Sequence, residues 1–220
     1  MAVLEAVRNE KVPGRLPGRS RSGKQSDKKL ELARHALSSL AELGFARINL
    51  REIAARSGVS LGVIHYYFED KNELLICCVG LYKDDFIQML DERIASAQSA
   101  GTLVSQFAGA LEQAVAEQSH VHRLWYDVRA QALFDASFGP VVGDLEHRMV
   151  GVVQRLLDRV RALGGRFDPG GPADATGAYV AIDGWFRYFL QQHIGGDTRA
   201  SALLRRRVEQ TLRLADSRRL

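Results

Sequence analysis

The chain has 220 residues, of which 46% are hydrophobic and 25% charged, and its formal net charge is +4. This composition is ordinary for a globular protein and excludes disorder along the whole length. No apolar run approaches the roughly 18 residues that a membrane helix needs, and the first residues are too short and too polar for a secretory signal. We therefore expect a cytoplasmic protein without a membrane segment.

The positive charge is unevenly distributed along the chain. Residues 1–27 carry six basic side chains against three acidic ones, so the N-terminal part of the chain holds a basic excess. Such a distribution is expected if this part meets a polyanion, whereas a solvated tail is the simpler alternative. Because two prolines and three glycines interrupt residues 13–23, we expect residues 1–25 to form a flexible basic arm.

Beyond the arm, the sequence pattern is helical. None of the five prolines falls between residues 18 and 139, so long helices are permitted there. Apolar residues recur at intervals of three and four, and no segment alternates as a strand does. We predict an all-α fold of about nine helices. They are expected at 27–43, after Asn49, after Ser60, from Asp70 to about 97, and at 103–118, 121–134, 140–163, 173–194 and 199–215.

The segment 50–64 has the residue types of a helix-turn-helix at the required spacing. Ala54 is small enough for two helices to cross closely, and Gly58 can adopt the left-handed conformation that ends the first helix. Ser60 can cap the second helix, while apolar residues at 53, 59 and 64 can pack beneath the turn. An unrelated helical hairpin with a glycine turn is the alternative.

Two flanking spacings predict helix starts. Asn49 with Glu52, and Asp70 with Glu73, are three residues apart, which is the spacing of a capping box. In that arrangement each side chain accepts a hydrogen bond from the amide of the other residue. We therefore expect helices to begin directly after residues 49 and 70.

The residues from Val63 to Leu75, VIHYYFEDKNELL, resemble the recognition-helix signature of the TetR family of one-component transcriptional regulators. The resemblance covers about residues 28–76, and beyond them only helix count, length and the phrase from Ile182 to Trp185 are similar. It implies a three-helix DNA-binding head, residues 26–72, and a six-helix effector-binding and dimerisation body, residues 73–220. It also implies a ligand-responsive regulator, most often a repressor, which binds a pseudo-palindromic operator and is released by a small organic effector.

By this resemblance, the recognition helix at 61–67 lies in the major groove of double-stranded DNA. Family members commonly have tyrosine where His65 stands, so the base preference stays open. We expect His65 and Tyr67 to meet DNA and Tyr66 to be partly packing. Phosphate contacts would set the register, and a few side chains would read bases. The expected DNA-binding residues are Asn49, Arg51, Ser60, Leu61, Gly62, His65, Tyr66, Tyr67 and Lys71, with Arg15, Arg19, Arg21 and Lys24 as possible minor-groove contacts of the arm.

One short recognition helix reads few base pairs, so we expect a homodimer with two-fold symmetry. The last two helices, at 173–194 and 199–215, are apolar enough to form its interface, although they would also suit the closed core of a monomer. Their expected packing residues are Ala175, Ala178, Tyr179, Ile182, Phe186, Phe189 and Leu190, and Leu203, Leu204, Val208, Thr211, Leu212 and Ala215.

The effector site is expected in the body, where aromatic and polar residues are interleaved. A mostly apolar pocket with a few polar groups suits a small organic molecule, although each residue taken singly also fits a core role. The candidate effector-binding residues are Phe86, Met89, Phe107, Trp125, Tyr126, Arg129, Tyr179, Asp183 and Phe186.

Other classes of function have weaker support in the sequence. There is no phosphate loop, nucleophile elbow, HExxH motif or carboxylate cluster, so we expect neither an enzyme nor a cofactor. His120 and His122 could bind a metal together with Glu146 or His147, but a structural role is the stronger interpretation, and we expect no metal. Cys77 and Cys78 leave a redox-responsive regulator as an alternative. The remaining alternatives are a helical small-molecule binding protein without DNA binding and a sequence-indifferent DNA binder.

Overall fold

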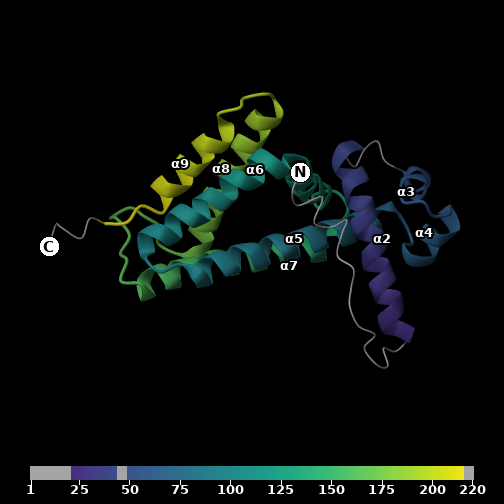
Figure 1. Cartoon of the computed structure of the whole chain (residues 1–220), viewed down its shortest axis with the longest axis horizontal. Helices are drawn as coiled ribbons and strands as arrows, with labels where there is room; N and C mark the ends of the chain where they lie inside the picture. The colour runs from purple at the N-terminus through teal and green to yellow at the C-terminus, as the bar shows by residue number, and fades with distance from the viewer. Residues whose placement is uncertain (1–20, 44–48, 216–220) are drawn as a thin grey trace.

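A computed structural model describes residues 21–43 and 49–215 of the chain. These residues form eight α-helices, one 3-10 turn and an isolated β-bridge between Phe167 and Leu214 (Figure 1). The all-α class predicted from the sequence is therefore confirmed. The elements are α2 (Arg21–Leu43), α3 (Leu50–Arg56), α4 (Leu61–Tyr67), α5 (Lys71–Ser96), α6 (Ala100–Gln131), η1 (Ala136–Phe138), α7 (Gly139–Ala162), α8 (Ala175–Ile194) and α9 (Ala200–Thr211).

The helix count differs from the prediction at one place. The segments expected as separate helices at 103–118 and 121–134 form the single helix α6. Gln118 nevertheless has non-helical backbone angles, φ −127° and ψ 22°, so the helix is kinked where the break was expected. The kink redirects the second half of α6 without ending the helix.

The N-terminal helix begins earlier than expected. Helix α2 starts at Arg21, so Arg21 and Lys24, which were assigned to the arm, belong to its first turns. Arg15 and Arg19 lie outside the described residues. The predicted capping residues Asn49, Ser60 and Asp70 do precede α3, α4 and α5.

Helices α2, α3 and α4 form the head, and they pack through small and branched apolar residues. Ile53 of α3 and Ile64 of α4 are fully buried, and Ala54 exposes only 3% of its surface. A larger side chain at residue 54 would have to displace these neighbours, because protein cores are close-packed. Helix α2 adds Leu32, Ala33, Ala36 and Leu40 to the same core.

Helix α5 belongs to two hydrophobic cores. Its first turns place Leu74, Leu75, Cys78 and Val79 in the core of the head. Its later turns place residues 86, 87, 90 and 94 in the core of the body. The head core also takes side chains from the second half of α6, including the fully buried Trp125. The head is therefore packed onto the body through α5 and α6.

The body consists of α5 to α9. Helices α5 and α7 lie side by side, and α6 packs against α5, α8 and α9 (Figure 1). Two ion pairs join α5 to α7, with Arg148 at 2.6 Å from Asp84 and Arg155 at 2.8 Å from Asp91. Both pairs are solvent-exposed, so each contributes at most about 1 kcal/mol, and the apolar core supplies most of the stability.

The turn between α3 and α4 depends on the backbone of Gly58, whose φ is +66°. We expect Gly58→Ala to lower the free energy of unfolding by about 1 kcal/mol, because a side chain is strained in this left-handed conformation. Gly58→Asn should cost less, since asparagine tolerates the conformation better. Urea denaturation measures both changes.

A helical glycine provides the control for this experiment. Gly62 lies inside α4 without a positive φ, so Gly62→Ala should raise the free energy of unfolding by about 0.5 to 1 kcal/mol. Equal effects of alanine at positions 58 and 62 would contradict the turn geometry described above.

Candidate functional site

Helix α3 begins at the surface with a side-chain cap. The side-chain oxygen of Asn49 accepts a hydrogen bond from the Glu52 amide at 2.9 Å. The carboxylate of Glu52 lies 3.2 Å from Arg56, so it forms an ion pair in place of the predicted return contact to residue 49. Arg51 follows the cap and is exposed. Asn49 and Arg51 therefore lie together at the open end of α3.

The turn that follows brings α4 to the surface. Beyond Gly58, the Val59 amide donates to the Ala54 carbonyl at 3.0 Å, which closes the turn against α3. The Ser60 hydroxyl accepts a hydrogen bond from the Val63 amide at 3.3 Å and caps α4. These contacts form the helix-turn-helix geometry that the sequence predicts.

One face of α4 points to solvent while the other packs into the head. Gly62 and His65 are exposed, and Tyr66 exposes 67% of its surface. Tyr67 is half-buried against the head core and meets the Tyr66 ring edge-on at a centroid distance of 4.9 Å. Tyr66 therefore points outward and Tyr67 is partly packed, whereas the sequence predicted that Tyr67 would be exposed and Tyr66 partly packed. Leu61 is also half-buried.

The start of α5 lies at the same end of the head. Lys71 is its first residue, and partial burial lowers the pKa of this lysine below its ordinary value. Asp70 caps the helix by accepting from the Glu73 amide at 2.8 Å. The Glu73 carboxylate accepts from the Glu69 amide at 2.6 Å and pairs with Lys29, so the predicted capping box is only half formed. The hydrogen bond from Lys29 holds the pKa of Glu73 below its usual range.

The predicted DNA-binding residues of the described head thus gather at one end of the molecule. Figure 1 places α3 and α4 at the end opposite to α9. Exposed polar and aromatic side chains near the start of a recognition helix can reach base edges. The lysine and the capping residues beside them can contact phosphates. The exposed members are Asn49, Arg51, Ser60, Gly62, His65 and Tyr66, and the half-buried ones are Leu61, Tyr67 and Lys71.

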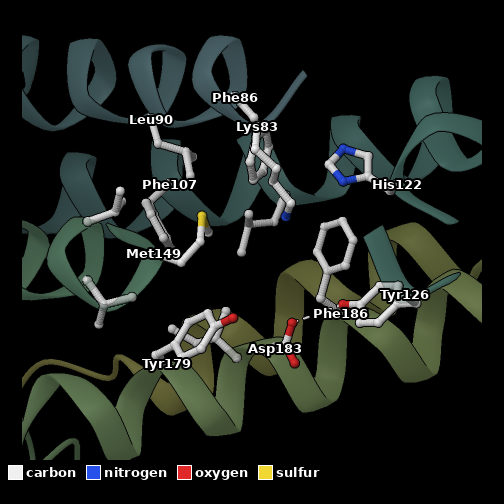
Figure 2. A pocket seen from close by; sticks show the side chains of 14 residues that line it. Lys83, Phe86, Leu90, Phe107, His122, Tyr126, Met149, Tyr179, Asp183 and Phe186 are labelled. Atoms are coloured by element: carbon white, nitrogen blue, oxygen red, sulfur yellow. Dashed lines mark hydrogen bonds between the residues drawn. The ribbon is translucent and has the colours of Figure 1, made fainter. Parts of the chain in front are cut away.

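A second site lies within the body, where a cavity of about 40 Å³ is enclosed by α5, α6, α7 and α8 (Figure 2). Six of the nine candidate effector residues line it. They are Phe86, Phe107, Tyr126, Tyr179, Asp183 and Phe186. The other three are elsewhere: Met89 packs at the edge of the body core, Trp125 belongs to the head core, and Arg129 lines an outer groove.

The cavity also contains polar residues that the sequence interpretation missed. Lys83 lines it with only 4% of its surface exposed, and His122 lines it with 1% exposed. A lysine on a long helix is ordinarily expected to be solvent-exposed, so the local sequence does not predict the burial of Lys83. His122 follows a polar stretch of α6, and from the sequence it was a candidate only for a metal ligand. Met149 of α7 completes the wall with a flexible side chain.

The Lys83 ammonium is surrounded by aromatic rings. Its nitrogen lies 4.6 Å from the centroid of Trp125, 5.6 Å from Phe86 and 5.7 Å from Tyr82. Cation–π contacts compensate part of the cost of burying a charge. Burial lowers the pKa of Lys83 from 10.5 to about 7, and Asp183 acts against this decrease.

Asp183 belongs to a polar cluster between the cavity and an outer groove. Its carboxylate accepts from Arg129 at 2.6 Å and from the Tyr126 hydroxyl at 3.0 Å. Arg129 also pairs with Glu146 of α7 at 2.8 Å. The groove beyond has a volume of about 820 Å³, and Tyr126, Tyr179 and Asp183 line both spaces. This cluster therefore forms the wall between the buried cavity and the surface of α6 and α8.

The cysteines and histidines have packing environments. Cys78 is buried, and its thiol lies 3.1 Å from the Ala33 carbonyl oxygen, while Cys77 is half-buried. Burial raises the pKa of both thiols, which disfavours the reactive thiolate. Within residues 21–43 and 49–215, no three His, Cys, Asp or Glu side chains are grouped to hold a metal ion. In the same ranges, no helix has both the length and the hydropathy of a membrane span.

Burial of Lys83 predicts a pH-dependent stability. The unfolded chain keeps the ordinary pKa near 10.5, so between pH 7 and 10.5 it binds the proton that the folded chain has lost, and stability rises with pH. Lys83→Met should therefore stabilise the protein most below pH 7. Its advantage should shrink by about 2 kcal/mol between pH 7 and 9, measured by urea denaturation.

A surface lysine provides the control for this experiment. Lys28→Met removes a lysine whose side chain is 43% exposed and should leave the pH profile unchanged. If Lys83→Met is less stable than the native chain at pH 6, the ammonium does not carry the burial cost inferred here.

Comparison with known proteins identifies the head. Residues 32–77 match the family model described as bacterial regulatory proteins, tetR family. Over 53 residues, the chain is 42% identical to the HTH-type transcriptional regulator BetI from Escherichia coli (strain K12 / DH10B), a match that covers 24% of this chain and 27% of that relative. The alignment thus spans about a quarter of the length of this curated relative.

Solved structures extend the likeness to the fold of the body. FadR from Bacillus subtilis in complex with stearoyl-CoA has a TM-score of 0.68 and 18% identity, covering 84% of this chain and 97% of that chain. A TetR transcription regulator from Haloarcula marismortui has a TM-score of 0.69 and 15% identity, covering 88% and 100%. A protein from Saccharomonospora viridis in complex with choline has a TM-score of 0.71 and 13% identity, covering 87% and 99%. The head is therefore similar in sequence to TetR-family helix-turn-helix regulators, and the chain as a whole has the fold of these solved structures.

Proposed function

We propose that this protein is a dimeric, sequence-specific DNA-binding regulator of transcription, most simply a repressor, that a small organic molecule releases from its operator. The observation that carries the proposal is the exposed face of α4, with Gly62, His65 and Tyr66 directed to solvent from a capped helix-turn-helix. The TetR-family match covers the same residues. An exposed recognition helix is the element that enters the major groove in such heads.

The residues of the head divide into two kinds of DNA contact. Arg51, His65 and Tyr66 are exposed and present groups that can meet base edges. Asn49, Ser60 and Lys71 lie at helix starts, where amides and positive charge favour phosphates. The carboxylates of Asp70 and Glu73 would repel a phosphate at the start of α5. A phosphate contact there would therefore come from the charge of Lys71 and not from the amides of the helix N-terminus.

A dimer would bring two such heads to successive half-sites of one duplex. The apolar residues of α8 that were expected at the interface are instead buried within the chain, together with Leu204 and Val208 of α9 and Leu212 directly after it. Five large apolar side chains remain exposed on these two helices. They are Val180, Trp185, Tyr188, Ile194 and Leu203, and of these Leu203 was among the residues expected at the interface. Their exposure on the last two helices supports dimerisation through these helices.

Helix α5 supports coupling between a bound molecule and the head. Lys71 begins α5 beside the recognition helix, and Lys83 and Phe86 of the same helix line the cavity, about 18 Å further along. The neighbouring folds with stearoyl-CoA and choline support a ligand in the body. A ligand that needs α5 in a shifted position would change the spacing of two heads. A nearly complete switch requires about 5.5 kcal/mol of difference in affinity between the two arrangements.

The DNA-binding proposal predicts different effects for two basic residues. Operator fragments selected from random DNA, titrated by fluorescence anisotropy at several salt concentrations, provide the measurement. Lys71→Ala should weaken binding to all sequences and reduce the slope of log K against log salt by about 0.9, the share of one phosphate. Arg51→Ala should relax the preference at one base position, with a loss of about 1 to 3 kcal/mol for the preferred base.

Arg161→Ala is the matched control, because it removes an exposed arginine at the far end of α7. It should leave operator affinity and salt slope within experimental error. Equal binding of selected and random DNA by the native chain would contradict sequence-specific recognition.

The dimer proposal predicts that a charge on the exposed face of α8 separates the protomers. Val180 exposes 62% of its surface in the single chain. Val180→Asp should weaken dimerisation at least about tenfold, because an unpaired carboxylate would be buried at the interface. Sedimentation equilibrium measures the dissociation constant. Ala95→Asp, on the exposed face of α5, is the control and should have no effect; a monomeric native chain would contradict the interface.

A further inference from the structure

We propose that the body cavity binds a small organic carboxylate, whose anionic group pairs with Lys83 and accepts a hydrogen bond from His122. This inference rests on the proposed function, because it names the chemical class of the effector. Two buried polar groups from different helices carry it. Each is a hydrogen-bond donor, and both line the same small cavity.

Lys83 is the first of these groups. Its side chain is almost fully buried, yet among the described residues no carboxylate lies within the 4 Å of an ion pair. The aromatic rings of Trp125 and Phe86 contact the ammonium but cannot accept its hydrogen bonds as an oxygen does. Burying a charged group without a hydrogen-bond acceptor costs free energy. An anion in the cavity would accept hydrogen bonds from the Lys83 ammonium and would therefore bind favourably.

His122 is the second group, and the Tyr82 hydroxyl is the partner of one of its ring nitrogens. The Tyr82 hydroxyl and Nδ1 of His122 share a hydrogen bond, and burial raises the pKa of Tyr82 well above its ordinary value, so the hydroxyl keeps its proton. Burial and the Lys83 charge lower the pKa of His122 well below its ordinary value, so the ring is neutral. In the proposed complex the Tyr82 hydroxyl donates to Nδ1, and the proton of the His122 ring lies on Nε2. That atom is buried and has no partner in the part of the chain that the structure describes.

The two donors both lie near the ring of Phe86. The Lys83 nitrogen lies 5.6 Å from the centroid of Phe86, and the His122 ring centroid lies 4.9 Å from the same point. Figure 2 shows His122 on one side of Lys83, and Leu90, Phe107 and Met149 on the other. The cavity thus has a polar end with two donors and an apolar end. A carboxylate with a short hydrocarbon body matches both.

The acid in the cavity wall does not reverse this preference. Asp183 is held by Arg129 at 2.6 Å and by the Tyr126 hydroxyl at 3.0 Å, so its charge is already compensated. A cation would meet the Lys83 ammonium without a carboxylate available to it. The volume of about 40 Å³ limits the occupant to a small molecule, although flexible Met149 can yield to a larger body.

Proton binding by Lys83 gives the site a pH dependence. The titratable and charged groups that face this lysine are Tyr82 on α5, His122, Tyr126 and Arg129 on α6, Glu146 on α7, and Tyr179 and Asp183 on α8. Burial lowers the pKa of Lys83 to about 7 in the empty cavity, and a bound carboxylate would raise it. Carboxylate affinity should therefore be nearly constant below pH 7. Above it, affinity should fall by up to about tenfold per pH unit.

Isothermal titration calorimetry on the full chain at about pH 6 tests the proposal with matched probes. Acetate, butyrate and benzoate are each compared with the corresponding amide, which has nearly the same shape but no charge. At least one carboxylate should bind about tenfold or more tightly than its amide, because charge-assisted hydrogen bonds are stronger than neutral ones. Tetramethylammonium should bind more weakly than either.

Two variants assign the preference to the proposed residues. Lys83→Met should bring the carboxylate and its amide to affinities within about twofold and remove the pH dependence. His122→Phe should weaken carboxylate binding about tenfold, and His122→Gln should restore part of the loss because glutamine keeps an N–H donor. Lys28→Met, at the surface of α2, should change nothing.

Three results would overturn the carboxylate proposal: equal affinity for acid and amide, tighter binding of tetramethylammonium, or no carboxylate binding up to about 10 mM. Operator affinity, measured in parallel, separates this proposal from the regulator itself. If the carboxylate binds through Lys83 and operator affinity is unchanged, the carboxylate site stands and the proposed release mechanism fails. If the operator is bound specifically and no carboxylate binds, the regulator stands and the ligand class is wrong.

Discussion

The continuity of α5 is the constraint on which the rest of the structure depends. One helix of 26 residues buries its first turns in the head and its later turns in the body. Its hydrogen-bonded backbone fixes the angle between the two ends, so the head cannot move independently of the residues beside the cavity. Because Lys83 and Phe86 belong to this helix, the cavity wall and the support of the recognition helix are parts of one element.

The body combines an ordinary apolar core with an unusual distribution of charge. Arg129 is shared by Asp183 and Glu146, which leaves those carboxylates compensated, while Lys83 is buried among aromatic rings. Burying a lysine lowers stability, and a stable core does not require one. The position is therefore better explained by a ligand than by folding. In the proposed function, the energy lost in the empty state becomes affinity for the occupant.

The head could be predicted from sequence because its determinants are local. A left-handed glycine, a capping serine and a small residue at a crossing each act within a few positions, and Gly58, Ser60 and Ala54 behave as expected. The exposures of Tyr66 and Tyr67 were not predictable, since neighbouring positions differ by only 100° around the helix. The burial of Lys83 could not be predicted, because it depends on α6, α7 and α8, which form the cavity together with α5. The sequence around residue 83 contains no information about these contacts.

The interruption at Gln118 has a consequence for insertions and deletions. An added residue in an unbroken helix rotates everything beyond it by about 100°, which would take His122 out of the cavity and Trp125 out of the head core. A position with non-helical backbone angles already lacks the regular ladder, so it can absorb one residue locally. Helix α6 thus contains a place where chain length can vary while the residues on either side keep their partners.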